Sequence, residues 1–227
     1  MLAPMETVLI TGANRGIGLS LAQAHARRGD RVIGVCRRES AELKATGAQV
    51  EAGIDVTDAT SLGALAKKLD RTPIQRLWLN AGVLEREKLG AIDSAGFESL
   101  RHQFEVNTLG PLRVAQALLE NIGSGSKIAI MTSRMGSMAD NDSGGYYGYR
   151  ASKAAVNAIG KSLAVDLKPR GVAVYLLHPG YVATDMVGGS GDITPEVAAQ
   201  RLVELVDRMD LEQSGSFHHS NGSELPW

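Results

Sequence analysis

Short apolar runs alternate with segments of helical periodicity along almost the whole chain. The expected strands lie at residues 7–10, 31–36, within 48–56, 74–82, 126–133 and 172–180, with a weaker one at 215–219. The expected helices lie at residues 19–29, 59–69, 97–121, 148–168 and 195–208, the third of them bent at Gly110-Pro111. Apolar strands that alternate with helices are typical of a parallel sheet covered on both faces. The sequence therefore predicts an α/β fold: a single-domain Rossmann fold with a doubly wound, mostly parallel sheet of about seven strands.

Length and composition narrow the class of protein further. The 227 residues contain no linker-like or low-complexity segment, so we expect one domain over residues 1–227, with a small substrate loop around 186–195. A net charge of −1 gives no reason to expect nucleic acid or a membrane surface as a partner. The single cysteine, Cys36, excludes an internal disulfide and a cysteine-rich zinc site, and the histidines lack metal-ligand spacing, so no metal is expected. With no apparent signal peptide or membrane span, we expect a cytoplasmic protein.

A glycine-rich segment, "TGANRGIG" at residues 11–18, joins the first expected strand to the first expected helix. Gly12 suits a tight turn, Gly16 lets the backbone approach a pyrophosphate, and Gly18 lets the helix pack closely on the sheet. Free N–H groups and the helix dipole attract anions at this position. The spacing G-x-x-x-G-x-G differs from the commoner G-x-G-x-x-G. The segment predicts a dinucleotide site, and a ligand-free glycine loop is the alternative.

The end of the second expected strand indicates which dinucleotide is bound. NAD sites often carry an acidic residue there, but this chain has Cys36 followed by Arg37 and Arg38. A guanidinium can bind a phosphate through two donors, and Arg15 adds a second positive charge from the glycine turn. We therefore expect NADP(H) in preference to NAD(H). The alternative is that the two arginines are a solvated loop pair.

Three tyrosines lie within "GGYYGYRASK", residues 144–153, and helical spacing separates them. If the predicted dinucleotide transfers hydride to a carbonyl, the resulting alkoxide needs a proton donor, and a tyrosine serves only if its anion is stabilised. Residues four apart share a helix face, so Lys153 lies on the face of Tyr149. The equivalent residue for Tyr147 is Ala151, and for Tyr146 it is Arg150 on another face. Tyr149 is therefore the expected general acid/base, and a surface helix pair is the alternative.

Seven motifs occur in one order along the chain. They are "TGANRGIG" (11–18), "IDVTD" (54–58), "NAG" (80–82), "EVNTLG" (105–110), "MTSRMGS" (131–137), Tyr149-x-x-x-Lys153 and "HPGYVATDM" (178–186). Together they resemble the short-chain dehydrogenase/reductase family of the classical type. "GGYYGYRASKAAVN" and the final "LPW" are most similar to the C-factor/sniffer branch of carbonyl-reductase-like members.

The resemblance implies an NADP(H)-dependent oxidoreductase that transfers hydride between the nicotinamide and a carbonyl or alcohol substrate. The cofactor-binding residues that it implies, together with those argued above, are Gly12, Asn14, Arg15, Gly16, Ile17, Gly18, Arg37, Asp55, Val56, Asn80, Ala81, Gly82, Tyr149, Lys153, Pro179, Gly180, Val182 and Thr184. Asp55 and Val56 would meet the adenine, residues 80–82 the adenosine ribose, and residues 179–184 the nicotinamide. Helix capping by Asp55 or Thr184, and a simple turn at 80–82, are the alternatives.

The implied catalytic residues are Asn107, Ser133, Tyr149 and Lys153. Ser133 would polarise the substrate carbonyl, although the interval to Tyr149 is longer than is common in the family, with "ADNDSGG" (139–145) resembling an added loop. Ser137 is closer to the common interval, but Ser133 is favoured because it lies directly at the strand end. Asn107 would lie at a helix bend that frees backbone groups to hold a water between Lys153 and solvent; an ordinary helix asparagine is the alternative.

The expected substrate wall is adaptable and mainly apolar, and comprises Met135, Tyr147, Tyr181 and Met186, with Met138 nearby. Such a wall suits a hydrophobic ketone, aldehyde or quinone, unless these side chains pack in the core or on a neighbouring subunit. Family members commonly assemble through the long helices, so we expect a homodimer or homotetramer formed through residues 97–121 and 149–168. The alternative function is an NADP(H)-binding regulatory or signalling protein with little turnover.

The cofactor assignment predicts the effect of a charge reversal at Arg37. Arg37→Asp should shift the preference from NADP(H) toward NAD(H), because a carboxylate repels the 2′-phosphate and accepts a hydrogen bond from a free ribose hydroxyl. Binding of both cofactors to the wild type and the variant measures this shift. An unchanged ratio of the two affinities would show that the assignment is wrong.

Overall fold

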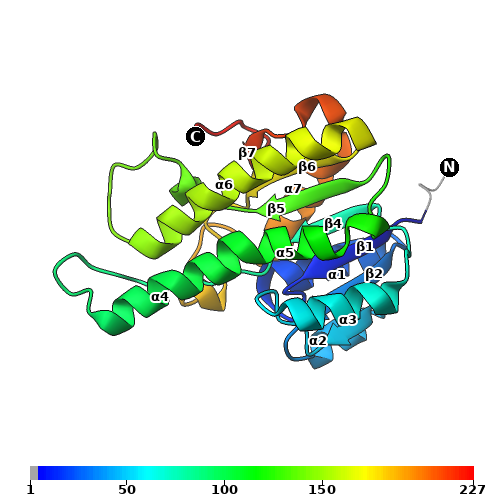
Figure 1. The fold of residues 1–227 in the computed structure, drawn as a ribbon, viewed down its shortest axis with the longest axis horizontal. Helices are drawn as coiled ribbons and strands as arrows, with labels where there is room; N and C mark the ends of the chain where they lie inside the picture. Colours follow the sequence, from blue (N-terminus) through cyan, green and yellow to red (C-terminus); the bar gives the residue numbers. More distant parts are fainter. Residues whose placement is uncertain (1–4) are drawn as a thin grey trace.

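One seven-stranded sheet forms the centre of the molecule, and all of its strands are parallel (Figure 1). The computed structural model describes residues 5–227; the first four residues, part of the N-terminal segment in which no signal peptide is expected, lie outside them. The strands are β1 (Thr7–Thr11), β2 (Arg31–Cys36), β3 (Gln49–Ala52), β4 (Arg76–Leu79), β5 (Lys127–Met131), β6 (Ala173–His178) and β7 (Phe217–His219). Their order is β3-β2-β1-β4-β5-β6-β7.

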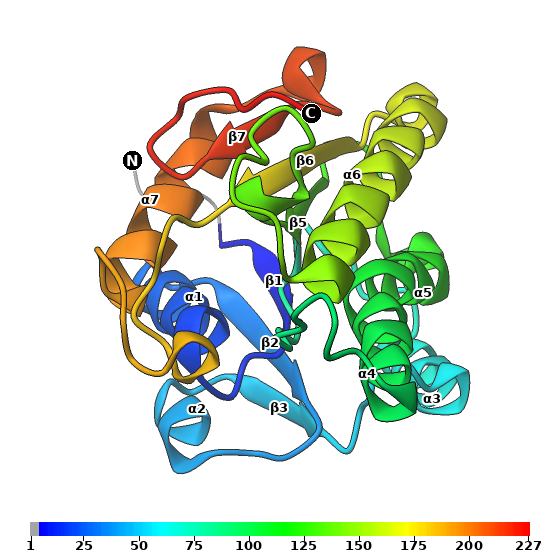
Figure 2. The same cartoon turned by 90° about the vertical axis from the view of Figure 1, so that its left-hand side faces the viewer.

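Helices cover both faces of the sheet (Figure 2). They are α1 (Gly16–Arg27), α2 (Ala41–Ala45), α3 (Ala59–Leu69), α4 (Ser94–Phe104), α5 (Gly110–Ala117), α6 (Tyr147–Leu167) and α7 (Pro195–Arg208). Helices α1, α2 and α7 lie on one side of the sheet, and α3 to α6 lie on the other. The predicted doubly wound Rossmann fold is confirmed, and the sheet is entirely rather than mostly parallel.

The two faces bury two separate apolar clusters, because successive side chains of a strand point to opposite faces. In β1, Leu9 joins the cluster under α3, α5 and α6, whereas Val8 and Ile10 join the cluster under α1 and α7. All three side chains are fully buried. This explains why the central strands have consecutive apolar residues and not only alternate ones.

The predicted helix over 97–121 is interrupted rather than merely bent. Helix α4 ends at Phe104, a π-helical turn occupies Glu105–Leu109, and α5 begins at Gly110. Pro111 has no N–H, and in a regular helix its ring would clash with the carbonyl of Asn107 four residues earlier. The extra residue in the turn, with the Gly110 N–H bonded to the Glu105 carbonyl, accommodates the proline.

Strand order decides where a ligand cleft can form. The chain proceeds from β1 to β2 and β3 on one side, and then crosses back to β4 on the other side of β1. Ligands of such sheets bind beyond the carboxyl ends of the strands at this reversal. The glycine turn after β1 and the segment after β4 both lie at this point. Of the helices within residues 5–227, none is both long and apolar enough to cross a membrane.

Candidate active site

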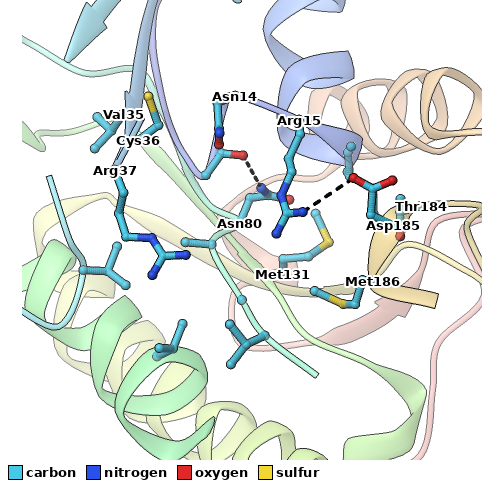
Figure 3. Close-up of a pocket in the computed structure, with 18 of the residues that line it drawn as sticks. Asn14, Arg15, Val35, Cys36, Arg37, Asn80, Met131, Thr184, Asp185 and Met186 are labelled. Carbon is cyan, nitrogen blue, oxygen red and sulfur yellow. Dashed lines mark hydrogen bonds and ion pairs between the residues drawn. The ribbon is translucent and has the colours of Figure 1, made fainter. Parts of the chain in front are cut away.

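A cleft of about 800 Å³ lies at the reversal of strand order (Figure 3). Its lining includes most of the predicted cofactor residues and one predicted substrate residue: Gly12, Asn14, Arg15, Gly16, Ile17, Arg37, Asp55, Val56, Asn80, Ala81, Gly82, Tyr149, Lys153, Pro179, Thr184 and Met186. The fold thus brings most of the predicted cofactor-binding residues together from segments that lie far apart in the chain.

The glycine turn leaves space for a ligand and leaves the amino end of α1 open. Gly12 and Gly16 have φ of 67° and 51°, values that favour glycine. A Cβ on Gly18 would lie 2.1 Å from the Gly12 carbonyl oxygen, so only glycine allows this close packing. No side chain caps the first N–H groups of α1, and its first turn has no acidic residue. These N–H groups are therefore available to an anion.

Asn80 fixes the shape of the turn from the neighbouring strand. Its side-chain amide donates to the carbonyls of Thr11 at 3.0 Å and Gly12 at 3.3 Å. The Thr11 hydroxyl in turn accepts the backbone N–H of Asn80 at 3.0 Å. The "NAG" segment is therefore more than a turn, because it holds the glycine loop against the end of β4.

Arg37 and Asp55 face each other on one wall of the cleft, with an Arg37 Nη1 to Asp55 Oδ2 distance of 3.9 Å. Asp58, not Asp55, caps helix α3, because its side chain accepts from the N–H groups of Thr60 and Ser61. Asp55 accepts both hydrogen bonds of Thr57 through Oδ1, leaving Oδ2 toward Arg37. The capping alternative for Asp55 is therefore excluded.

Arg15 lies opposite Arg37 and forms an ion pair across the cleft mouth (Figure 3). Its Nη1 lies 3.5 Å from Oδ2 of Asp185, and both side chains are largely exposed. An exposed pair of this kind contributes little stability. Neighbouring Thr184 makes no capping hydrogen bond, which removes the capping alternative for that residue.

Tyr149 and Lys153 lie one helical turn apart on α6 at the inner end of the cleft. Lys153 Nζ lies 5.8 Å from the centre of the Tyr149 ring and donates to the Met131 carbonyl at 2.9 Å. Burial lowers the pKa of Lys153 to about 8. An ammonium has three donors, so two remain for other groups.

The pKa of Tyr149 is raised in the protein alone, because burial disfavours the phenolate more than the neighbouring Ser133 hydroxyl stabilises it. This differs from the depression that the tyrosine–lysine pair alone would suggest. The Ser133 hydroxyl favours the ionised form of Tyr149 against the effect of burial.

Ser133 and Ser137 occupy different environments. Ser133 immediately precedes a short 3-10 turn, Arg134–Gly136, where its hydroxyl accepts the Met135 N–H at 3.1 Å and lies near enough to Tyr149 to lower the pKa of the phenol. The Ser137 hydroxyl donates to the main-chain oxygen of Trp227 at 3.1 Å and accepts the Asp140 N–H at 3.1 Å. The Ser137 hydroxyl therefore uses both its proton and an acceptor position in hydrogen bonds to the backbone.

The Asn107 side chain is fully buried and engaged with the backbone beside the site. Its amide oxygen accepts the Val83 N–H at 2.8 Å, and its amide nitrogen donates to the Val83 carbonyl at 2.8 Å. Its own carbonyl cannot form an α-helical bond with Pro111, which has no N–H. The role of Asn107 in holding a water stays a prediction.

Eight predicted residues do not line the cleft: Gly18, Asn107, Ser133, Met135, Tyr147, Gly180, Val182 and Tyr181. Val182 is buried and pairs with Ile193 in an isolated bridge, which ties down the 186–195 loop. Tyr147 and Tyr181 are 38% and 50% exposed, so neither packs in the core. Their role as a substrate wall stays a prediction.

The cleft also contains residues to which the sequence analysis assigned no site role: Val35, Cys36, Ile54, Val83, Val106, Met131, Thr132 and Asp185. Most of them flank a predicted residue at the end of a strand, and this position was the signal that could have identified them. Arg38, which the sequence analysis considered together with Arg37, lines the cleft as well. Asp185 follows Thr184 directly, but nothing in the sequence pairs it with Arg15. Within residues 5–227, no group of three His, Cys, Asp or Glu side chains could hold a metal ion.

Comparison with known proteins identifies the family. A model of the short chain dehydrogenase family matches residues 6–193. The 1-hydroxy-2-glutathionyl-2-methyl-3-butene dehydrogenase of Rhodococcus sp. (strain AD45) is 43% identical over 98% of this chain and all of its own. C-signal of Myxococcus xanthus is 40% identical over 72% of this chain and 99% of its own. The chain belongs to the short-chain dehydrogenase family.

Solved structures agree with this assignment. The carbonyl reductase Sniffer of D. melanogaster superposes with a TM-score of 0.88 and 29% identity, covering 98% of this chain and all of that one. A carbonyl reductase from Pseudomonas aeruginosa PAO1 in complex with NADP gives a TM-score of 0.83 and 34% identity, with the same coverage. The resemblance to the C-factor/sniffer branch is therefore confirmed.

The environments of the two serines predict different effects of their removal. Ser133→Ala should lower kcat by about a hundredfold, because it removes a donor aimed at the developing charge. Ser137→Ala should lower kcat by less than about tenfold, because its hydroxyl serves the backbone. Steady-state kinetics of both variants measure the difference, and a larger loss for Ser137→Ala would contradict the assignment.

Proposed function

We propose that this protein is an NADP(H)-dependent oxidoreductase that interconverts a carbonyl and an alcohol, with Tyr149 as the general acid/base. One observation carries the proposal: a buried tyrosine and a buried lysine line a cleft that also contains an uncapped helix N-terminus, and the hydroxyl of Ser133 lies beside the tyrosine. A protein that only bound a dinucleotide would have no need to bury a lysine and a tyrosine there.

The cleft fits a dinucleotide. The amino end of α1 and the glycine turn would hold the pyrophosphate, while Asn80 to Gly82 would lie along the adenosine ribose. Lys153 would donate to the nicotinamide ribose, and the Pro179–Thr184 segment would lie beside the nicotinamide. When bound there, the cofactor supplies or accepts the hydride and, in its oxidised form, adds a positive charge.

The protein's own groups manage the proton. Ser133 has one hydroxyl proton, which it would donate either to the substrate oxygen or to the Tyr149 oxygen, stabilising negative charge on the one that accepts it. Tyr149 would give its proton to the nascent alkoxide in reduction and take one from the alcohol in oxidation. The ammonium of Lys153, 5.8 Å from the ring, favours the phenolate that remains. A water held at the Asn107 carbonyl would return the proton from solvent to Lys153.

Preference for NADP(H) is supported by the charges around the adenosine end of the cleft. Arg15, Arg37 and Arg38 all line it, and they provide more positive charge than Asp55 and Asp185 offset. A 2′-phosphate could replace these carboxylates as the partner of Arg15 or Arg37. Neither ion pair is buried, so the cost of exchanging it is small.

Two classes of substrate follow from the relatives. The P. aeruginosa and D. melanogaster structures are of carbonyl reductases, which suits a hydrophobic aldehyde, ketone or quinone. The Rhodococcus relative acts on an alcohol that carries a glutathionyl group, and it is 43% identical over nearly the whole of both chains. Oxidation of such a thioether-bearing alcohol is therefore a second candidate reaction.

Similarity to C-signal supports a second candidate function, namely a signalling protein that binds NADP(H) with little turnover. Measurement of turnover distinguishes the enzyme from the signalling protein.

We also propose a homodimer or homotetramer, a single domain over the whole chain, and a cytoplasmic location, as the sequence predicts.

The proposal predicts nicotinamide-linked turnover that depends on Tyr149. Benzaldehyde, acetophenone and benzoquinone with NADPH, and the glutathionyl alcohol with NADP⁺, are followed by nicotinamide absorbance. At least one should turn over, and Tyr149→Phe should slow it by about a hundredfold or more, because the phenyl ring has no proton to transfer. Tyr147→Phe is the matched control and should keep kcat within a few fold. Tight NADPH binding without turnover would favour the signalling protein, and an active Tyr149→Phe would disprove the acid/base role.

A further inference from the structure

The segment after β7 returns toward the active site and ends against the loop that follows Ser133 (Figure 2). The main-chain oxygen of Trp227 accepts hydrogen bonds from the Ser137 hydroxyl at 3.1 Å, the Met138 N–H at 3.1 Å and the Ala139 N–H at 3.0 Å. Three donors converging on one oxygen make this a specific attachment and not a chance contact.

The indole ring of Trp227 is anchored separately. It stacks on Phe217 of β7, with ring centroids 5.5 Å apart and an interplanar angle of 27°. Phe217 is fully buried and packs with Leu176 of β6 and Leu225. The N–H of Leu225 also bonds to the Phe217 carbonyl at 2.8 Å. Residue 227 is therefore held to the edge of the sheet and is not a free chain segment.

The loop that Trp227 holds connects directly to the catalytic groups. Gly136 packs so closely on α6 that a Cβ there would lie 2.7 Å from the carbonyl carbon of Lys153. The N–H of Gly136 bonds to the Ser133 carbonyl at 2.8 Å, and the Met135 N–H bonds to the Ser133 hydroxyl at 3.1 Å. A shift of residues 137–139 would thus move the 3-10 turn that orients Ser133.

The loop has few other restraints on this side. Met138 is 77% exposed, and Gly144 and Gly145 both have positive φ, so the stretch before Tyr149 has little packing of its own. Arg134 pairs with Asp140, and Arg150 of α6 donates to the Ser143 hydroxyl, to the Gly144 carbonyl and, in the 3-10 turn, to the Met135 carbonyl. The hydrogen bonds to Trp227 are what joins residues 137–139 to the sheet.

We propose that Trp227 is a positioning residue for the proposed reaction: through Ser137, Met138 and Ala139 it fixes the turn that holds the Ser133 hydroxyl against Tyr149. This inference rests on the proposed function, because its catalytic consequence requires Ser133 to act on the substrate and on Tyr149. It assigns a role to the final "LPW" and to Ser137, neither of which contacts the reacting atoms.

Two measurements test the proposal, and the first does not depend on turnover. Amide hydrogen exchange at Met138 and Ala139 should be about tenfold faster in Trp227→Ala than in the wild type, because the ring no longer anchors their acceptor. Trp227→Phe should restore most of the protection, since a phenyl ring can still stack on Phe217. Glu224→Ala, an exposed change in the same segment, is the control and should leave exchange unchanged.

The second measurement is the pH dependence of alcohol oxidation, with benzyl alcohol or the glutathionyl alcohol as substrate. A displaced Ser133 stabilises the phenolate less, so the rising limb of kcat should move to higher pH in Trp227→Ala, and kcat should fall about tenfold. NADP⁺ affinity should stay within about twofold, because Trp227 does not line the cleft. Ser137→Ala should shift the rising limb in the same direction.

Unchanged exchange at Met138 and Ala139 in Trp227→Ala would overturn the attachment, and faster exchange with an unchanged pH profile would overturn the positioning role. Absence of turnover in the wild type would instead refute the proposed function, and with it the positioning role, while the exchange result still decides the attachment. The two failures are therefore distinguishable.

Discussion

The buried ammonium of Lys153 is the group on which the active-site arrangement depends. It is 4% exposed and has one described protein acceptor, the Met131 carbonyl, so it is under-satisfied for a charged side chain. Burial that lowers its pKa from 10.5 to about 8 corresponds to about 3 kcal/mol against the charged form. This cost is present below pH 8 and disappears as the pH rises above 10.5, because the folded-state pKa is the lower one.

A buried charge that costs this much stability is expected only where it takes part in binding or catalysis. Lys153 lines the cleft beside Tyr149, where ribose hydroxyls and a phenolate would satisfy its other two donors. The fold delivers this geometry through a few elements: β5 ends at Met131, α6 carries the tyrosine and lysine, and Ser133 immediately precedes the 3-10 turn between them. Catalytic groups fixed on packed elements need little reorganisation during reaction.

Much of this arrangement follows from the sequence, for physical reasons. Apolar strands alternating with helices allow few topologies, and the glycine turn identifies the end of β1 as the ligand end. Helical spacing separates Tyr149 from Tyr146 and Tyr147.

Two other features were not predicted, because they depend on local stereochemistry that periodicity does not report: the short helix α2, and the π-helical turn that accommodates Pro111. Long-range pairings, namely Arg15 with Asp185 and Ser137 with Trp227, could not be predicted, because each joins loops whose approach is decided by the whole fold. The direction of the Tyr149 pKa was also out of reach, because burial of the ring is a tertiary property.

The most direct test of the account is a paired measurement on Lys153→Met, which keeps the length of the side chain and removes its charge. If the lysine is buried for catalysis, the variant should unfold at a higher temperature at pH 7, because a buried charge is replaced by an apolar group. Its single-turnover rate with bound NADPH should fall by about a hundredfold or more. A variant that is less stable yet retains turnover would show that Lys153 is structural, and would contradict the account.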